Sequence, residues 1–136
     1  MLFLRLFKNF KELANANESE VLRAWQGLGY YSRARNIHAA AKEVHFNLND
    51  EFPNNFNDLK KLPGIGNYTA AAIASIAFGE VVPAIDGNAI RVYARYFYFD
   101  KPVDNQKAQQ YFFKEAIKLM QNHDPSDFNQ AIMELG

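Results

Sequence analysis

A lone carboxylate, Asp86, has the strongest potential for chemistry in this sequence. It stands at the start of a helical pattern whose apolar residues fall within 90–96, so its side chain can accept hydrogen bonds from the first amides of that helix. Those amides favour the charged form of a carboxylate, and a fixed anion can stabilise positive charge that develops during a reaction. An ionised carboxylate is unsuited to donating a proton. Capping the helix is the alternative role; it is worth about 1 kcal/mol, and the two roles are compatible.

A glycine turn precedes this carboxylate by one helix. Residues 62–66 read Leu-Pro-Gly-Ile-Gly and lie between two helical patterns. Glycines let backbone amides approach an anion closely, and the helix that begins near Tyr68 directs its positive amino end toward the same place. The spacing therefore predicts a phosphate-binding hairpin, although the same turn taken alone is more typical of an ordinary helix C-cap.

The elements that must hold these groups are predicted to be helices, because apolar residues recur at helical spacing and alternating strand patterns are nearly absent. An amino-terminal helix is expected where Leu4, Phe7 and Phe10 share a face. The later helices are expected to begin at Asn17, Ser32, Asn55 or Asn57, Tyr68, Asp86, Asp104 and Asp124. Residues 1–136 are thus expected to form one all-α domain with a helix-hairpin-helix near 57–78.

Composition narrows the possible partners. The net charge is zero, so any nucleic-acid binding must depend on local charge and backbone amides, not on a global field. The absence of cysteine excludes disulfides and thiolate-bound metal within these residues. His38, His45 and His123 lack the spacing of metal ligands, so we predict no metal site. The apolar start, residues 1–7, is too short for a membrane span and lacks signal-peptide features, and we expect a soluble protein.

Four segments, in the same order along the chain, resemble the helix-hairpin-helix DNA glycosylases and, among these, the branch that removes adenine mispaired with 8-oxoguanine. They are residues 25–36, 62–70, 86–88 and 128–136. The similarity runs from about Leu13 to Gly136. It implies the all-α helix-hairpin-helix DNA glycosylase fold, as a six-helix barrel module with parts of the flanking iron–sulfur module missing and the chain truncated at both ends.

The resemblance implies roles near the carboxylate. Asp86 would be the catalytic anion, Tyr68 would reach into the base pocket or touch the catalytic acid, and Asn88 would orient the aspartate or the sugar. The alternatives are a core tyrosine for Tyr68 and a polar first-turn residue for Asn88. The hairpin would contact DNA through Leu62, Gly64, Ile65, Gly66 and Thr69.

Residues 25–36 would provide a second DNA contact by the same resemblance. Tyr31 would be the wedge that enters the base stack beside the lesion. Its insertion would offset part of the cost of unstacking a base, which is on the order of a few kcal/mol. Tyr30 is expected to pack in the core. The other predicted contacts are Gln26 and Leu28 in the same gap and, on phosphates, Arg33 and Arg35. Solvated charges are the commoner meaning of such arginines on a helix face.

Two positions separate this chain from related lyases that act on thymine glycol. Those lyases carry a lysine nucleophile where this chain has Tyr68, and a Thr-His pair where it has Gly87-Asn88. A lysine would form a Schiff base with the sugar, which a tyrosine cannot do. The resemblance therefore implies a monofunctional adenine glycosylase of base-excision repair. A thymine-glycol-type glycosylase/lyase and a non-catalytic helix-hairpin-helix DNA-binding module are the alternatives.

The resemblance also implies parts outside these 136 residues. The family's proton-donating glutamate precedes the segment similar to Leu4–Leu13, and Glu18, Glu20 and Glu80 do not occupy the matching motif. In the family, four cysteines hold a 4Fe–4S cluster, and they come after the segment that corresponds to residues 128–136 of this chain. We expect a monomeric fragment, without a cofactor of its own, that binds double-stranded DNA with an A·G or A·8-oxoguanine mismatch weakly and turns over almost nothing alone. The expected location is a bacterial cytoplasm or a eukaryotic nucleus.

Overall fold

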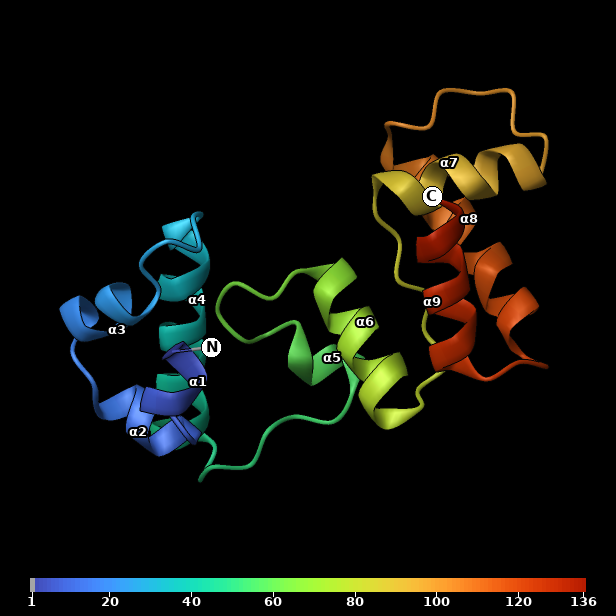
Figure 1. Ribbon diagram of the computed structural model, residues 1–136. Helices are drawn as coiled ribbons and strands as arrows, with labels where there is room; N and C mark the ends of the chain where they lie inside the picture. The colour runs from blue at the N-terminus through green and yellow to red at the C-terminus, as the bar shows by residue number, and fades with distance from the viewer. Residues whose placement is uncertain (1) are drawn as a thin grey trace. The chain divides into compact units, whose positions relative to one another are not determined.

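The computed structural model describes residues 2–136, and within that range every regular element is a helix. Figure 1 shows short helices joined by turns and extended links. The helices are α1 (Leu2–Leu6), α2 (Phe10–Asn15), α3 (Glu18–Ala24), α4 (Tyr31–Lys42), the π-helix η1 (Glu43–Asn47), α5 (Phe56–Leu59), α6 (Asn67–Phe78), α7 (Gly87–Tyr96), α8 (Gln106–Met120) and α9 (Pro125–Leu135). The predicted all-α class is confirmed.

Asparagine and aspartate side chains start most of these helices. In each case the side-chain oxygen accepts a hydrogen bond from an amide in the first turn, which satisfies a donor that has no partner inside the helix. The capping residues are Asn9 (α2), Asn17 (α3), Asn55 (α5), Asp86 (α7), Asn105 (α8) and Asp124 (α9). The predicted starts at Asn17, Asn55, Asp86 and Asp124 are confirmed.

Two predicted starts are wrong by one or two residues, and α6, expected from about Tyr68, begins at Asn67. Asn105, not Asp104, caps α8, because the side-chain Nδ2 atom of Asn105 also donates to the Pro102 carbonyl at 3.1 Å and so fixes the side chain at the helix start. α4 begins at Tyr31, before Ser32, because Tyr30 adopts a left-handed conformation (φ 48°) that turns the chain directly into the helix.

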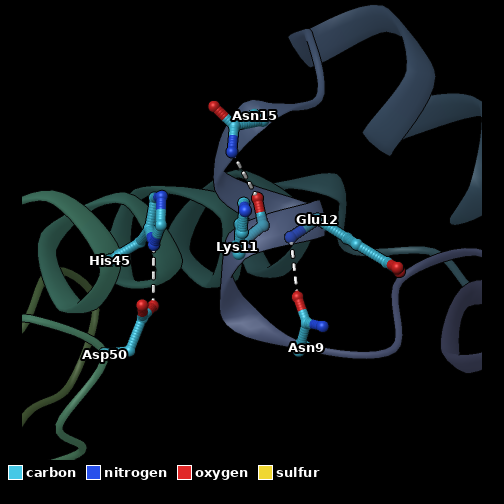
Figure 2. A network of polar contacts seen from close by, with 6 residues as sticks. All are labelled: Asn9, Lys11, Glu12, Asn15, His45 and Asp50. Carbon is cyan, nitrogen blue, oxygen red and sulfur yellow. Dashed lines mark hydrogen bonds and ion pairs between the residues drawn. The ribbon is translucent and has the colours of Figure 1, made fainter.

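The predicted amino-terminal helix is two helices, α1 and α2. Asn9 separates them, because its side-chain oxygen accepts from the Glu12 amide at 2.8 Å and starts a new helix (Figure 2). The Glu12 carboxylate in turn accepts from the Lys8 amide at 2.9 Å. Apolar spacing alone could not reveal this break, since Phe7 and Phe10 on either side of it keep the helical repeat.

The chain folds into two compact units. The first contains the residues up to Pro53 together with Lys61–Gly64, and the second contains Asn54–Lys60 together with Ile65–Gly136. In the first unit α2 and α3 pack against α4, and the ring of Phe3 meets that of Trp25 edge to face, with 5.3 Å between the ring centres. In the second unit α6 packs on α9, and α7 packs on both α8 and α9.

Tyr93 lies at the centre of an aromatic cluster between α7 and α8. Its side chain is 1% exposed, and its ring stacks on that of Phe112 with 6.3 Å between the ring centres. Its hydroxyl has no hydrogen-bond partner among residues 2–136. Burial raises the pKa of Tyr93 from 10.0 to about 12, because the tyrosinate anion would lose its hydration in this cluster.

This pKa predicts a loss of stability in alkali. The folded protein keeps the Tyr93 proton where the unfolded chain releases it, so the contribution is complete below pH 10.0 and is lost as the pH rises toward about 12. Changing Tyr93→Phe is expected to remove this dependence and to raise relative stability at the alkaline end by about 2 kcal/mol. Urea unfolding between pH 8 and pH 12 measures the difference, and Tyr111→Phe, which removes a more exposed hydroxyl, is the control. Parallel curves for Tyr93→Phe and the unchanged protein would contradict the prediction.

Candidate functional site

Asp86 and Tyr68 line the same cavity in the second unit. The cavity has a volume of about 520 Å³, which lies within the range of small-molecule sites. Its walls come from the amino ends of α6 and α7, from the first turns of α8 and from Phe56. Two residues that the sequence singled out on separate helices are therefore brought together.

The Asp86 side chain serves both the helix and the cavity. Its Oδ1 atom accepts a hydrogen bond from the Ala89 amide at 2.8 Å, which caps α7 as the sequence predicts. Its Oδ2 atom has no hydrogen-bond partner among residues 2–136, and the side chain is half-buried. One oxygen thus fixes the carboxylate while the other can face a ligand.

Tyr68 supplies a neutral hydroxyl to this cavity. Burial, and next the negative charge of Asp86, raise the pKa of Tyr68 above its ordinary value of 10.0, because both disfavour a second anion there. The phenol is therefore protonated throughout the neutral range and can donate a hydrogen bond. The half-buried position beside the cavity differs from that of a core tyrosine.

An extended link, residues 80–85, connects α6 to Asp86, and polar side chains fix the position of this link. At its start the Glu80 carboxylate accepts from the Phe56 amide, with 3.2 Å between Oε2 and the nitrogen. Further along, the buried Asn129 of α9 bonds to the backbone of Val82 and Ala84. Sequence reasoning missed the role of Asn129; the available signal was an amide beside Phe128 and Ile132, the apolar residues of α9 that pack against the core.

Three glutamines of α8 form a further part of the cavity wall that the sequence analysis did not identify. Gln106, Gln109 and Gln110 share one face of the helix with Phe113. Their spacing of three and four residues was the signal that could have found them. Their amides add hydrogen-bonding capacity to the cavity that Asp86 lines.

In the hairpin, Gly64 has a backbone conformation that strongly favours glycine. Its φ is +75°, and a Cβ added there would lie 2.4 Å from the Cβ of Asn36 in the first unit. Leu62 is buried and anchors the preceding turn, whereas Gly64 itself is exposed. The backbone conformation and the close contact with Asn36 therefore require glycine at this position, and the contact of the hairpin with a phosphate stays a prediction.

Gly66 starts α6 without a side-chain cap, unlike the asparagines and aspartates that start six other helices. Ile65 before it is half-buried, and Thr69 in the first turn is exposed. The first amides of α6 therefore have no side-chain acceptor, which is the state that favours an anionic ligand. α4 likewise begins without a side-chain cap, at Tyr30.

The turn before α4 presents aromatic side chains outward. The Trp25 indole nitrogen donates to the Gly29 carbonyl at 2.8 Å and holds the turn against the core of the first unit. Tyr30 is 79% exposed and Tyr31 is 42% exposed. The expectation that Tyr30 packs in the core is wrong, because its left-handed backbone points the side chain away from the buried face of α4.

The remaining predicted contacts of the first unit are also exposed. The Arg33 guanidinium lies over the rings of Tyr30 at 5.1 Å and Trp25 at 5.9 Å, which orders its charge near the turn. Arg35 pairs with Glu18 at 2.8 Å, an exposed ion pair of small energetic weight. The structure also leaves two residues of the turn exposed, Gln26 and Leu28.

The structure places other candidate groups away from the cavity. Asn88 is exposed, is not part of the cavity wall, and accepts a hydrogen bond from Arg91. Within residues 2–136 no three His, Cys, Asp or Glu side chains converge as metal ligands. The sequence has no cysteine, so it provides no thiolate for the iron–sulfur cluster that the resemblance implies. None of the described helices is long and apolar enough to cross a membrane.

Known proteins with similar sequences include adenine DNA glycosylases. The chain is 46% identical over 124 residues to "Adenine DNA glycosylase" of Arabidopsis thaliana, covering 91% of this chain and 20% of that protein. It is 39% identical over 135 residues to the Homo sapiens protein of the same name, covering 98% of this chain and 25% of that protein. The chain thus spans about a quarter of the length of these relatives or less.

Solved structures give the same fold. A thermostable thymine-DNA glycosylase matches with a TM-score of 0.83 and 27% identity, over 97% of this chain and 61% of that chain. An endonuclease III trapped as a covalent intermediate with DNA matches in fold with a TM-score of 0.82 over 98% of this chain and 61% of that chain, at 24% identity. The family described as "HhH-GPD superfamily base excision DNA repair protein" matches this chain over residues 2–118, and the chain belongs to this superfamily.

Proposed function

We propose that the complete product of the gene encoding this chain is a monofunctional DNA glycosylase. It removes adenine mispaired with guanine or 8-oxoguanine in double-stranded DNA. The observation that carries this proposal is the half-buried carboxylate of Asp86 beside the neutral Tyr68 in a cavity of about 520 Å³. The protein acts as a monomer on the genome, in a bacterial cytoplasm or a eukaryotic nucleus.

The reaction adds water across the bond between adenine and deoxyribose. The hydroxyl group goes to the sugar carbon, and a proton goes to the departing base. Positive charge develops on the sugar as the bond breaks, and the free Oδ2 atom of Asp86 stabilises it electrostatically. Tyr68 offers a hydroxyl and no amine, so the sugar is not captured as a Schiff base and the DNA backbone stays intact.

Local groups hold the DNA, since the net charge is zero. The hairpin and the uncapped start of α6 offer backbone amides to a phosphate. The ordered guanidinium of Arg33 offers a charge, and Tyr30 and Tyr31 offer exposed rings to the base stack. The greater exposure of Tyr30 makes it a wedge candidate beside Tyr31.

Adenine release from defined duplexes tests the proposal. The complete gene product should release adenine from A·8-oxoguanine and A·G duplexes under single-turnover conditions and spare A·T duplexes. Borohydride should trap no covalent adduct. Action on thymine glycol with a trapped adduct would favour a glycosylase/lyase instead. Salt-dependent duplex binding without base release would indicate a DNA-binding module.

A further inference from the structure

Asn129 is a fully satisfied polar side chain in the interior of the second unit. It lies on α9 and is 1% exposed. Its Oδ1 atom accepts from the Ala84 amide at 3.1 Å. Its Nδ2 atom donates to the Val82 carbonyl at 2.9 Å and to the Ser75 hydroxyl at 2.8 Å. One amide group therefore uses its acceptor and both of its donors inside the fold.

These bonds fix the backbone just before Asp86. Val82 and Ala84 belong to a link with no helical hydrogen bonds of its own, and Ala84 precedes Asp86 by two residues. The Ser75 hydroxyl donates to the Ala71 carbonyl at 2.7 Å, so its oxygen accepts from Asn129 and connects the link to α6. Neither a carboxylate nor an apolar side chain could make this set of bonds, because it requires an acceptor and two donors together.

α9 also contacts the chain just after Asp86. A Cβ added at Gly136 would lie 2.6 Å from the Cβ of Asn88, so the end of this helix approaches the first turn of α7 closely. Asp86 is thus bracketed, with Asn129 bonded to the backbone on one side and Gly136 packed against the other. Among residues 2–136, the hydrogen bonds of Asn129 go to Ser75, Val82 and Ala84 and not to the carboxylate of Asp86.

We infer that Asn129 is a positioning residue that sets where the free oxygen of Asp86 stands relative to the sugar of a bound nucleotide. This inference rests on the proposed function, because the position of the carboxylate matters only if a sugar approaches it. A carboxylate displaced by about 1 Å loses much of its effect on a developing charge, and losses on the order of 100-fold follow from such shifts. Asn129 acts through the backbone of the link and touches no substrate.

The test compares two abasic analogues in duplexes opposite 8-oxoguanine. A pyrrolidine carries a positive charge where the sugar becomes cationic, whereas a tetrahydrofuran is neutral and of similar shape. The ratio of the two dissociation constants reports whether an anion stands at the sugar. The complete gene product should bind the pyrrolidine at least about tenfold more tightly at low salt. Asn129→Leu should reduce the ratio to about two or less and leave the affinity for tetrahydrofuran within about twofold.

Ser75→Ala is the matched control. It removes a bond from the same buried network and leaves both bonds to the link, so it should lower the unfolding temperature without changing the ratio. If Asn129→Leu does not fold, Asn129→Asp takes its place. The aspartate places an oxygen where the Asn129 Nδ2 atom donates to the Val82 carbonyl, so the two oxygens repel each other and the ratio should fall similarly.

The outcomes separate the inference from the proposed function. If Asp86→Asn abolishes the preference for the pyrrolidine but a folded Asn129 variant keeps it, the positioning role alone is overturned. A protein with no preference for the pyrrolidine overturns both. Loss of the ratio in Asn129→Leu but not in Ser75→Ala supports the positioning role.

Discussion

Replacing Asp86 with asparagine is expected to lower single-turnover adenine excision by about 1,000-fold or more while the fold survives. The charge that stabilises the cationic sugar disappears, and the loss of such a group typically costs several kcal/mol in the transition state. The asparagine oxygen can still accept from the Ala89 amide, so the cap of α7 is kept and stability should change by less than about 1 kcal/mol. Excision kinetics and thermal unfolding measure the two effects separately.

Asp124→Asn is the control for this change. Asp124 caps α9 by the same kind of bond, accepting from the Asp127 amide at 2.9 Å, and it is exposed and outside the cavity. It should leave excision within about twofold of the unchanged protein. An Asp86→Asn protein that excises adenine at the normal rate would remove this carboxylate from the mechanism.

Replacing Gly64 with alanine is expected to destabilise the first unit by roughly 2–4 kcal/mol. The backbone there has a φ of +75°, and the new Cβ would lie 2.4 Å from the Cβ and 2.6 Å from the Cγ of Asn36. The contact with the Cβ cannot be relieved by rotating the Asn36 side chain, so the backbone of the hairpin must shift. Trp25, the one tryptophan of the sequence, is buried in the same unit, and its fluorescence during urea unfolding reports the loss.

Substitutions at two other glycines separate the cost of backbone strain from the cost of the steric clash with Asn36. Gly29 has a φ of +69° and no atom within 4 Å of an added Cβ, so Gly29→Ala should cost about 1–2 kcal/mol through backbone strain alone. Gly66 has a φ of −86° and equally open surroundings, so Gly66→Ala should cost at most about 1 kcal/mol. Equal losses at all three positions would contradict the structural account of the hairpin. Duplex affinity should fall most for Gly64→Ala.

Local chemistry made much of this fold predictable. An asparagine or aspartate before an apolar repeat is a reliable helix start, which is why Asn17, Asp86 and Asp124 were identified correctly. Asn9 and Asn105 obey the same rule, but the sequence analysis did not assign them as caps. The meeting of Asp86 and Tyr68 at one cavity followed from a resemblance and not from periodicity.

Contacts between distant residues set the limit of prediction. The bond from Ala84 to Asn129 spans 45 positions, and no repeat in the sequence indicates it. The α8 glutamines face the cavity only because α7 and α8 pack together. The exposure of Tyr30 depends on one left-handed φ, which is uncommon for a tyrosine and has no sequence signal of its own.

At position 66, the start of α6, the residue that best stabilises the helix differs from the residue that best leaves its first amides available to a ligand. A serine or aspartate there would occupy an amide that Gly66 leaves open and would strengthen the helix by roughly a few tenths of a kcal/mol. The same side chain would compete with a phosphate oxygen for that amide. The stability of α6 and the availability of its first amides therefore favour different residues at position 66, and glycine keeps the amides available at the expense of helix stability.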